Sequence, residues 1–200
     1  MMRAANVFFD TEFGGFLPHQ VRLISIGFVS EHNRSLYLEL EGVTPEMCSP
    51  FVLDSVLPLL NGGPKTSRDD AAVRVRDYLV SFGCAVTLWT DSPGYDAFLL
   101  SELVAGVRKE LPEIRICTPE FDGLSARMHY VNHSEVLFET RQLRRHHALD
   151  DAKAMRNGWL AVQRCKPSKI EDAARDPGTL DHFTAAPSAP ESETGFRLSE

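Results

Sequence analysis

The sequence predicts one mixed α/β domain, in which a single sheet is covered by helices. Three apolar, strand-like runs come first in the chain, at residues 6–9, 21–29 and 36–40. From about residue 49 onwards, segments with helical and strand-like patterns alternate. Three strands followed by such an alternation are typical of a mixed sheet with helices on its faces. The hydrophobic content of 43% and the charged content of 24% are those of an ordinary soluble globular domain.

Each predicted element has its own local signal. The polar turn at 30–35 separates two strand-like runs, which favours an antiparallel hairpin. Two prolines limit a helical stretch within 49–60. Ser67 is placed to cap a helix that reaches about Phe82. The remaining predicted elements are a strand at 85–90, a helix at 95–110, a short strand near 114–117, a helix near 121–130 and a helix from about 150.

The domain is expected to span residues 1–165, with residues 166–200 as an acidic and disordered tail. From Glu171 to the end there are seven acids and two bases, so this segment carries −5 of the net charge of −7. Prolines among Ser, Thr, Ala and acidic residues argue against a packed core in the tail.

Composition also restricts where the protein is expected to work. No apolar run approaches the ~20 residues of a membrane span, and the N-terminus lacks the pattern of a signal peptide. The four cysteines are widely spaced without a C-x-x-C pair, which indicates free thiols rather than disulfides or a zinc site. We therefore expect a cytoplasmic protein with no membrane partner.

The first motif that carries chemistry is FFDTEF, which places Asp10 and Glu12 at the end of the first strand-like run. Side chains two apart on a strand point the same way, so the carboxylates would lie ~6–7 Å apart at the backbone. A divalent cation between them would offset their repulsion. A bare D-x-E is common by chance, so two acids that face water are the alternative.

The second motif is GYDAFLL, which contains Asp96. Leu99, Leu100 and Leu103 follow it by three, four and seven residues, which places Asp96 on the apolar face of its own helix. An aspartate there is unusual unless it is paired or binds a metal ion. The other interpretation is an acid near a helix N-terminus that the helix dipole favours.

The third motif is HHALDDA, in which His146 precedes Asp151 by five residues. Asp150 and Asp151 are predicted to open an amphipathic helix, where the dipole favours an anion and therefore suits a metal ligand. Taken singly, His146 would be an ordinary surface histidine and each aspartate an ordinary helix cap.

Taken together, the three motifs resemble those of the DEDD superfamily of 3′–5′ exonucleases, in the branch whose last motif is H-x-A-x-x-D. The matching residues are Asp10, Glu12, Asp96, His146, Ala148 and Asp151. The resemblance covers roughly residues 5–165 and is greatest to the small bacterial, mycobacterial-type 3′–5′ exoribonucleases. There are two departures where substrate would enter. The family's frequent N-x-x-F-D is S-P-G-Y-D here, and residue 13 is Phe instead of threonine.

The resemblance implies a ribonuclease H-like fold and a metal-dependent 3′–5′ exoribonuclease that releases nucleoside 5′-monophosphates. In that case Asp10, Glu12, Asp96 and Asp151 would hold two Mg²⁺ or Mn²⁺ ions, for which oxygen ligands are suited. His146, whose ordinary pKa is near neutrality, would be the general base.

Substrate contacts are expected next to the first motif. Gly14 and Gly15 would allow close approach of the backbone to the terminal nucleotide, while Phe13 and Phe16 would stack or wedge at its base. Tyr95 is a further expected substrate contact. Packing of Phe13 in the core is the alternative. Eight basic residues against two acids in 141–169 form a local patch for phosphates, or else a solvated helix face.

The expected partner is single-stranded nucleic acid, with RNA preferred. The same chemistry on DNA is the nearest alternative, because nothing in the sequence recognises the 2′-hydroxyl unambiguously. A nuclease fold that only binds nucleic acid is a second alternative, which the presence of every catalytic-type residue argues against. Homodimer formation stays open.

Overall fold

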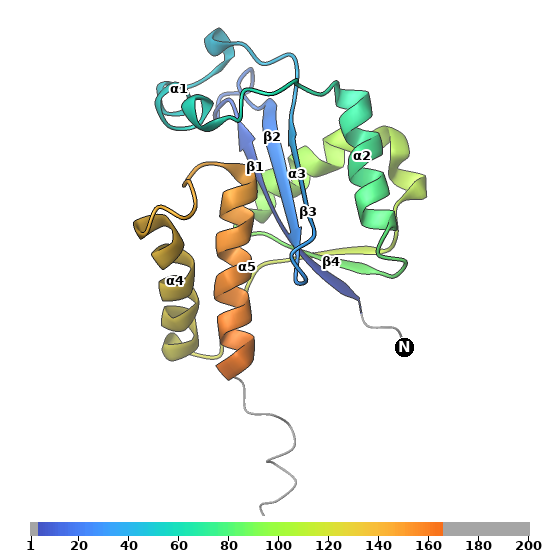
Figure 1. The fold of residues 1–200 in the computed structure, drawn as a ribbon. Coiled ribbons are helices and arrows are strands. Elements are labelled where there is room, and N and C mark those ends of the chain that lie inside the picture. Colours follow the sequence, from blue (N-terminus) through green and yellow to red (C-terminus); the bar gives the residue numbers. More distant parts are fainter. Residues whose placement is uncertain (1–3, 166–200) are drawn as a thin grey trace, which may run out of the picture. The chain divides into compact units, whose positions relative to one another are not determined.

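The computed structural model describes residues 4–165, and the predicted tail at 166–200 lies outside them. The described residues form one compact unit on a five-stranded mixed sheet in the order β3-β2-β1-β4-β5 (Figure 1). The strands are β1 (Ala5–Phe13), β2 (Leu23–Ser30), β3 (Ser35–Glu39), β4 (Val86–Trp89) and β5 (Ile114–Cys117). β1, β2 and β3 form an antiparallel meander, and β4 and β5 run parallel to β1.

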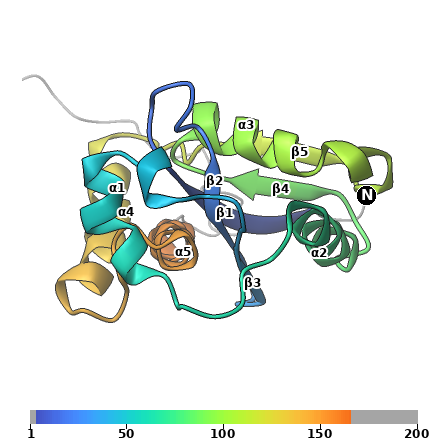
Figure 2. The ribbon, with the colours of Figure 1, turned by 90° about the horizontal axis from the view of Figure 1, so that it is seen from above.

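Helices cover both faces of this sheet. In the described part of the chain the α-helices are α1 (Pro50–Ser55), α2 (Arg68–Val80), α3 (Pro93–Leu103), α4 (Leu124–Glu139) and α5 (Ala148–Cys165). α2 and α3 pack on one face, and α5 packs on the other with α4 alongside it (Figure 2). Ser67 caps α2 as predicted, since its hydroxyl accepts a hydrogen bond from the backbone N–H of Asp70 at 3.1 Å.

The side chains of β1 alternate between two separate parts of the core. Val7 and Phe9 point into the larger hydrophobic cluster, which α2 and α3 cover. Phe8 points the other way and packs against α5. Because Asp10 and Glu12 follow Phe8 at the strand spacing of two, both carboxylates face α5. The fold therefore directs the first motif toward the helix that carries the third.

The predicted mixed sheet covered by helices is confirmed, but several boundaries differ. β1 continues to Phe13, past both carboxylates, because its pairing with β2 extends that far. α4 starts later than the predicted helix near 121–130, since Gly123 precedes it in a left-handed conformation with φ 89°. The predicted helix at 95–110 divides into α3 and a 3-10 segment, Ala105–Glu110. Within residues 4–165, no helix has the length and apolar character to cross a membrane.

Candidate functional site

A pocket of about 330 Å³ opens beside the last part of β1, with α3, α4 and α5 around it. Each residue that the sequence marks as a metal ligand or catalytic base lines this pocket: Asp10, Glu12, Asp96, His146 and Asp151. These residues come from β1, the first turn of α3, the residues before α5 and the first turn of α5. The structure thus brings together in one place three motifs that are far apart in the chain.

The close approach of α5 to the sheet depends on Gly27, which pairs with Asp10 across β1 and β2. A Cβ added at Gly27 would lie 2.3 Å from the backbone nitrogen of Leu149 and 2.6 Å from the carbonyl carbon of Ala148. Only a residue without a side chain lets the first turn of α5 lie against the strand at this point. This contact brings Asp151 beside the carboxylates of β1.

The backbone at the start of α5 fixes the orientation of the third motif. His146 has φ 64°, in the left-handed region that residues with a side chain seldom adopt. The Asp151 carboxylate accepts a hydrogen bond from the backbone N–H of His147 at 3.1 Å. The His146 ring also meets the edge of Phe51, with ring centroids 5.0 Å apart. The left-handed turn therefore holds His146 over the pocket while Asp151 is tied to the same turn.

Asp96 is held by two threonines and is only 1% exposed. Thr11 Oγ1 donates a hydrogen bond to its Oδ1 at 2.5 Å, and the Thr90 hydroxyl donates to its Oδ2. Thr11 belongs to β1 and Thr90 directly follows β4, so the carboxylate is fixed between two neighbouring strands. The burial of this aspartate on the apolar face of its helix is as predicted.

The ligand atoms form two groups, and within each group they lie within 4.8 Å of one another. The first group is Asp10, Asp91 and Asp96, and the second is Glu12, His146 and Asp151. Oxygen and nitrogen atoms at these separations are close enough to coordinate one cation in each group. The site therefore has the donors for two cations side by side.

Asp91 is the site residue that the sequence analysis did not assign. It comes one residue after Thr90 and two after the end of β4, the parallel neighbour of β1. The carboxyl ends of neighbouring parallel strands meet at the same edge of a sheet, where ligands bind in α/β folds. The sequence does contain a signal for Asp91, because this acid directly follows the predicted strand at 85–90.

Burial and mutual repulsion raise the pKa of the clustered carboxylates. Burial raises the pKa of Asp10 well above its ordinary value, and neighbouring carboxylate charges raise it further. Burial, with the charge of Asp151, raises the pKa of Glu12 to about 8. Burial also raises the pKa of Asp151 to about 7 and that of Asp96 to about 6, although hydrogen bonds to both oppose this.

The donor set suits divalent cations. Among the described residues that line the pocket, Arg145 is the one guanidinium, and it is already paired with Glu135. Five further carboxylates then face one another without a cationic side chain between them. So much buried negative charge is costly unless a cation offsets it. Oxygen donors in this number favour Mg²⁺ or Mn²⁺, whereas a structural zinc site favours Cys and His.

Only the first of the two adjacent histidines faces the pocket. His147 is 1% exposed, stacks on Tyr37 with ring centroids 4.4 Å apart, and has its Nε2 3.0 Å from Nη2 of Arg144. His146 instead has a ring nitrogen within 4.8 Å of carboxylate oxygens in the second ligand group. Burial and the charge of Arg145 lower the pKa of His146, which favours a neutral ring that can accept a proton.

An aromatic cluster lies beside the carboxylates. Phe13 stacks on Tyr95 with ring centroids 5.1 Å apart, and Phe16 meets both rings edge-on. Phe13 also lines the pocket itself, and the side chain of Phe16 is 73% exposed. Phe13 also packs against the larger hydrophobic cluster, and Tyr95 is not among the described residues that line the pocket. Contact of either ring with a substrate stays a prediction.

The two glycines of the first motif have a packing role. A Cβ added at Gly14 would lie 2.7 Å from the carbonyl oxygens of Gln20 and Met47, and one added at Gly15 would lie 2.5 Å from Oε1 of Gln20. The strand end must therefore carry glycines for the following loop to fold back against it. Neither glycine lines the carboxylate pocket in the described range, and their contact with substrate stays a prediction.

Much of the basic segment at 141–169 is used inside the protein. Arg144 donates to the Asp150 carboxylate at 2.7 Å and to a backbone carbonyl oxygen at 3.0 Å. Lys153 contacts the same carboxylate at 3.3 Å. Arg156 donates to the carbonyl oxygen of Glu31 at 2.7 Å. These bases hold the start and the outer side of α5 in place.

Comparison with known proteins establishes the fold. No family model and no curated protein matches the sequence. The chain is similar to E. coli ExoI, in a zinc-bound structure with single-stranded DNA, with a TM-score of 0.52 and 12% identity. The chain has the ribonuclease H-like fold. The match covers 86% of this chain and 43% of the ExoI chain, so the chain spans less than half the length of ExoI.

A second solved structure matches more weakly. S. pombe Pop2p, in a form bound to Mg²⁺ and Mn²⁺, matches with a TM-score of 0.44 and 14% identity, over 86% of both chains.

Proposed function

We propose that the chain is a metal-dependent exonuclease of the DEDD type, which removes nucleotides from the 3′ end of single-stranded nucleic acid and prefers RNA. The observation that carries this proposal is the pair of ligand groups in one pocket, each of which joins a carboxylate of β1 to residues of a second, distant segment, 91–96 or 146–151. The fold is shared with ExoI, whose structure contains single-stranded DNA, and this supports a single-stranded substrate.

The residues divide into cation ligands and a proton acceptor. Asp10, Asp91 and Asp96 would hold one Mg²⁺ or Mn²⁺ ion, and Glu12 and Asp151 would hold the other. Such ions, when bound, supply activation of the attacking water and neutralise charge that develops on the scissile phosphate.

His146 is the proton acceptor in this proposal. Its lowered pKa keeps the ring neutral near pH 7, and it lies beside the second ligand group, where it can take a proton from the attacking water. The water's oxygen forms the new bond to phosphorus, and the bond from phosphorus to the 3′ oxygen of the preceding nucleotide breaks. The products are a nucleoside 5′-monophosphate and a strand with a new 3′ hydroxyl.

A 3′–5′ DNA exonuclease is the second candidate, because the ExoI structure holds DNA. Both activities would use the same carboxylates and the same histidine, so the sugar preference rests on the resemblance of the three motifs to small bacterial exoribonucleases. A module that only binds nucleic acid has no need for six carboxylates in one pocket, five of them without a cationic partner.

Oligonucleotides of matched sequence, 5′-labelled and made as RNA or DNA with a 3′ hydroxyl or a 3′ phosphate, test the proposal in Mg²⁺ or Mn²⁺. We expect stepwise shortening from the 3′ hydroxyl, faster on RNA, with no activity in EDTA or in a folded Asp10→Ala protein. Cleavage from the 5′ end, or internal cleavage, would overturn the exonuclease proposal. Equal or faster hydrolysis of DNA would overturn only the preference for RNA.

We also propose that the enzyme works in the cytoplasm, and its oligomeric state can be measured. All four cysteines are free, which suits the reducing cytoplasm. Sedimentation equilibrium of the full chain would show whether it forms a homodimer.

A further inference from the structure

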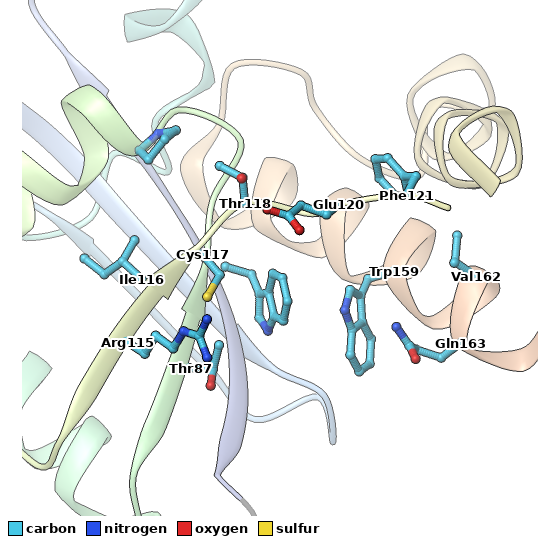
Figure 3. A pocket seen from close by; sticks show the side chains of 12 residues that line it. Thr87, Arg115, Ile116, Cys117, Thr118, Glu120, Phe121, Trp159, Val162 and Gln163 are labelled. Atoms are coloured by element: carbon cyan, nitrogen blue, oxygen red, sulfur yellow. The ribbon is translucent and has the colours of Figure 1, made fainter. Parts of the chain in front are cut away.

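A second hollow, of about 540 Å³, lies on the same face of the sheet as the carboxylate pocket. α5 packs mainly on β1, β2 and β3, and the hollow lies between α5 and β5, at the edge of the sheet. Figure 3 shows Trp159 and Gln163 on α5, across a gap from Arg115 and Cys117 on β5. Phe121 lies at one end of the gap. The proposed hydrolysis does not use any of these residues.

Rigid aromatic walls line this hollow. The chain has two tryptophans, Trp89 and Trp159, and both are among its lining residues. The indole N–H of Trp89 donates to Oδ1 of Asn6 at 3.0 Å, and its ring stacks on Phe8 with centroids 6.4 Å apart. Trp159 meets the edge of the same Phe8 ring at 5.4 Å. Because the core fixes both indoles, their surfaces are in position before a ligand arrives.

The polar groups around the hollow have their bonding capacity available. Within residues 4–165, the structure gives no hydrogen-bond or ion-pair partner to the side chains of Arg115, Glu120 and Gln163. A guanidinium, a carboxylate and an amide together offer several donors and several acceptors. Aromatic surfaces for stacking, with donors and acceptors at their rim, suit a flat heteroaromatic ring such as a nucleobase.

The residues that line the two hollows are neighbours in the structure. Met155 lines the carboxylate pocket, and Trp159 lines the second hollow one turn further along α5, ~5.4 Å away along the helix. Phe121 of the second hollow packs against Tyr130 of the carboxylate pocket, with ring centroids 4.7 Å apart. A strand bound at the carboxylates is therefore within short reach of the indoles.

The aromatic cluster and the second hollow lie on different sides of the first turn of α3. Pro93 lines the second hollow, whereas Tyr95 stacks on Phe13 in the aromatic cluster. Residues two apart on a helix project in nearly opposite directions. One strand can accordingly place its terminal base on the aromatic cluster and an earlier base in the hollow, with the scissile bond between them.

We propose that the second hollow binds a nucleobase of the substrate strand on the 5′ side of the scissile bond. The inference rests on the proposed exonuclease function and adds a subsite to it. The two indoles contact each other with centroids 6.1 Å apart, so they form one aromatic surface with no room for a ring between them. The base stacks against this surface, while Arg115, Glu120 and Gln163 contact its polar edge or the adjoining phosphate. Substrates long enough to reach the subsite are bound more tightly than shorter ones.

Tryptophan fluorescence reports on this subsite directly, because both tryptophans of the chain line it. The full chain with His146→Ala, in Mg²⁺, would be titrated with a single-stranded hexanucleotide and with versions that carry one abasic nucleotide at successive positions. We expect the intact oligomer to change the emission. An abasic nucleotide at one position close to the 3′ end should remove most of that change, and one at the 5′ end should not.

Two variants, at exposed Arg115 and half-buried Gln163, test the polar contacts without removing a residue of the hydrophobic clusters. Arg115→Ala and Gln163→Ala should each raise the Kd for the hexanucleotide, on the order of tenfold for the loss of a base subsite. Arg108→Ala, which removes the same charge outside the hollow, is the matched control and should bind the hexanucleotide like the parent.

The possible outcomes distinguish failure of the subsite proposal from failure of the exonuclease proposal. If wild-type protein hydrolyses the oligomers but abasic position has no effect on emission, or Arg115→Ala binds like Arg108→Ala, the subsite is wrong and the exonuclease proposal stands. If wild-type protein hydrolyses no oligomer, the exonuclease proposal itself is wrong.

Discussion

Asp10 is the carboxylate of the site that is surrounded by the most negative charge, and its pKa is raised accordingly. Burial raises its pKa most, and the charges of four neighbouring carboxylates raise it further. Without a cation, folding brings ionised carboxylates close together, and their burial and mutual repulsion destabilise the folded state. A bound divalent ion removes that penalty and stabilises the folded state by mass action. The site therefore costs stability in metal-free protein and adds stability when metal is bound.

We expect the metal-free protein to lose stability as the pH rises from about 5 to about 8. The folded-state pKa values of Glu12 (about 8), Asp151 (about 7) and Asp96 (about 6) lie above those of unfolded carboxyls, which are ~4. The folded protein then binds more protons than the unfolded chain across this range, so folding is favoured at its acidic end. Melting temperatures in EDTA at half-unit pH steps would measure the slope.

The Glu12→Gln variant tests whether the raised pKa of Glu12 causes this fall of melting temperature with pH. It removes the charge whose pKa is raised to about 8, so it should flatten the slope and raise the melting temperature at pH 8 in EDTA. Glu113→Gln changes an exposed glutamate outside the site and should leave both unchanged. A melting temperature that climbs between pH 5 and pH 8 in EDTA would contradict the argument.

Asp91 is expected to be a cation ligand in its own right. Its carboxylate lies within 4.8 Å of ligand atoms on Asp10 and Asp96, and Arg145, the one guanidinium among the described residues that line the pocket, is paired with Glu135 instead. Asp91→Asn should therefore weaken Mn²⁺ binding, measured by titration calorimetry, by about 10-fold. It should leave the fold intact, because Asp91 is exposed. Asp122→Asn, an exposed aspartate outside the pocket, is the control, and equal affinities in the two variants would exclude Asp91 as a ligand.

The two adjacent histidines should differ in what their loss affects. His146→Ala removes the proposed proton acceptor, so kcat should fall ~10²–10⁴-fold while the melting temperature stays within a few degrees. His147→Ala removes a buried ring stacked on Tyr37 and bonded to Arg144, so its main effect should be a lower melting temperature. Rates at saturating metal and thermal melts of both variants distinguish these effects. A larger loss of kcat in well-folded His147→Ala would mean that the assignment of the two histidines is reversed.

At the scale of elements, the site depends on how closely α5 lies on β2. Gly27→Ala would place a methyl group 2.3 Å from the backbone of Leu149, a contact that only a shift of α5 can relieve. Such a shift moves Asp151 away from Asp10, so both the melting temperature and Mn²⁺ affinity should fall together. Gly106→Ala, where an added Cβ meets nothing within 4 Å, is the control. Unchanged Mn²⁺ affinity in Gly27→Ala would show that the site does not need this contact.

Features that depend on neighbouring residues in the chain were predictable, and features that depend on which elements meet were not. The Ser67 cap and the strand near 114–117 follow from local residue preferences, and the structure contains both. The three motifs could be found because each is short. Asp91 and Gly27 matter only because β4 lies beside β1 and α5 crosses β2, and residue periodicity does not give these contacts. The packing of Gly14 against the Gln20 backbone is likewise a contact that residue periodicity does not predict.

At the scale of the whole molecule, the charge balance limits how a polyanion can bind. The net charge is −7, and the segment from Glu171 to the end carries −5 of it. In the part of the basic segment that the structure describes, Arg144, Arg145, Lys153 and Arg156 already have partners in the protein. Few cations are then available for phosphates, so affinity must come mainly from bound metal ions and from stacking on aromatic rings.

This balance predicts a weak dependence of activity on salt. Each phosphate contact contributes a slope of about −0.7 to the logarithm of binding against the logarithm of salt for single strands. Exposed Arg141 and Arg164, like Arg115 at the second hollow, have no hydrogen-bond or ion-pair partner within residues 4–165, so we expect a slope no steeper than about −2 for kcat/KM on RNA at constant Mg²⁺. Arg141→Ala should make the slope shallower by about 0.7. Arg156→Ala should lower the melting temperature instead and leave the slope unchanged, because its guanidinium is bonded to backbone carbonyl groups. A wild-type slope of about −3 or steeper would mean that several more phosphates are held by charged side chains, and it would overturn the balance of metal and stacking argued from the structure.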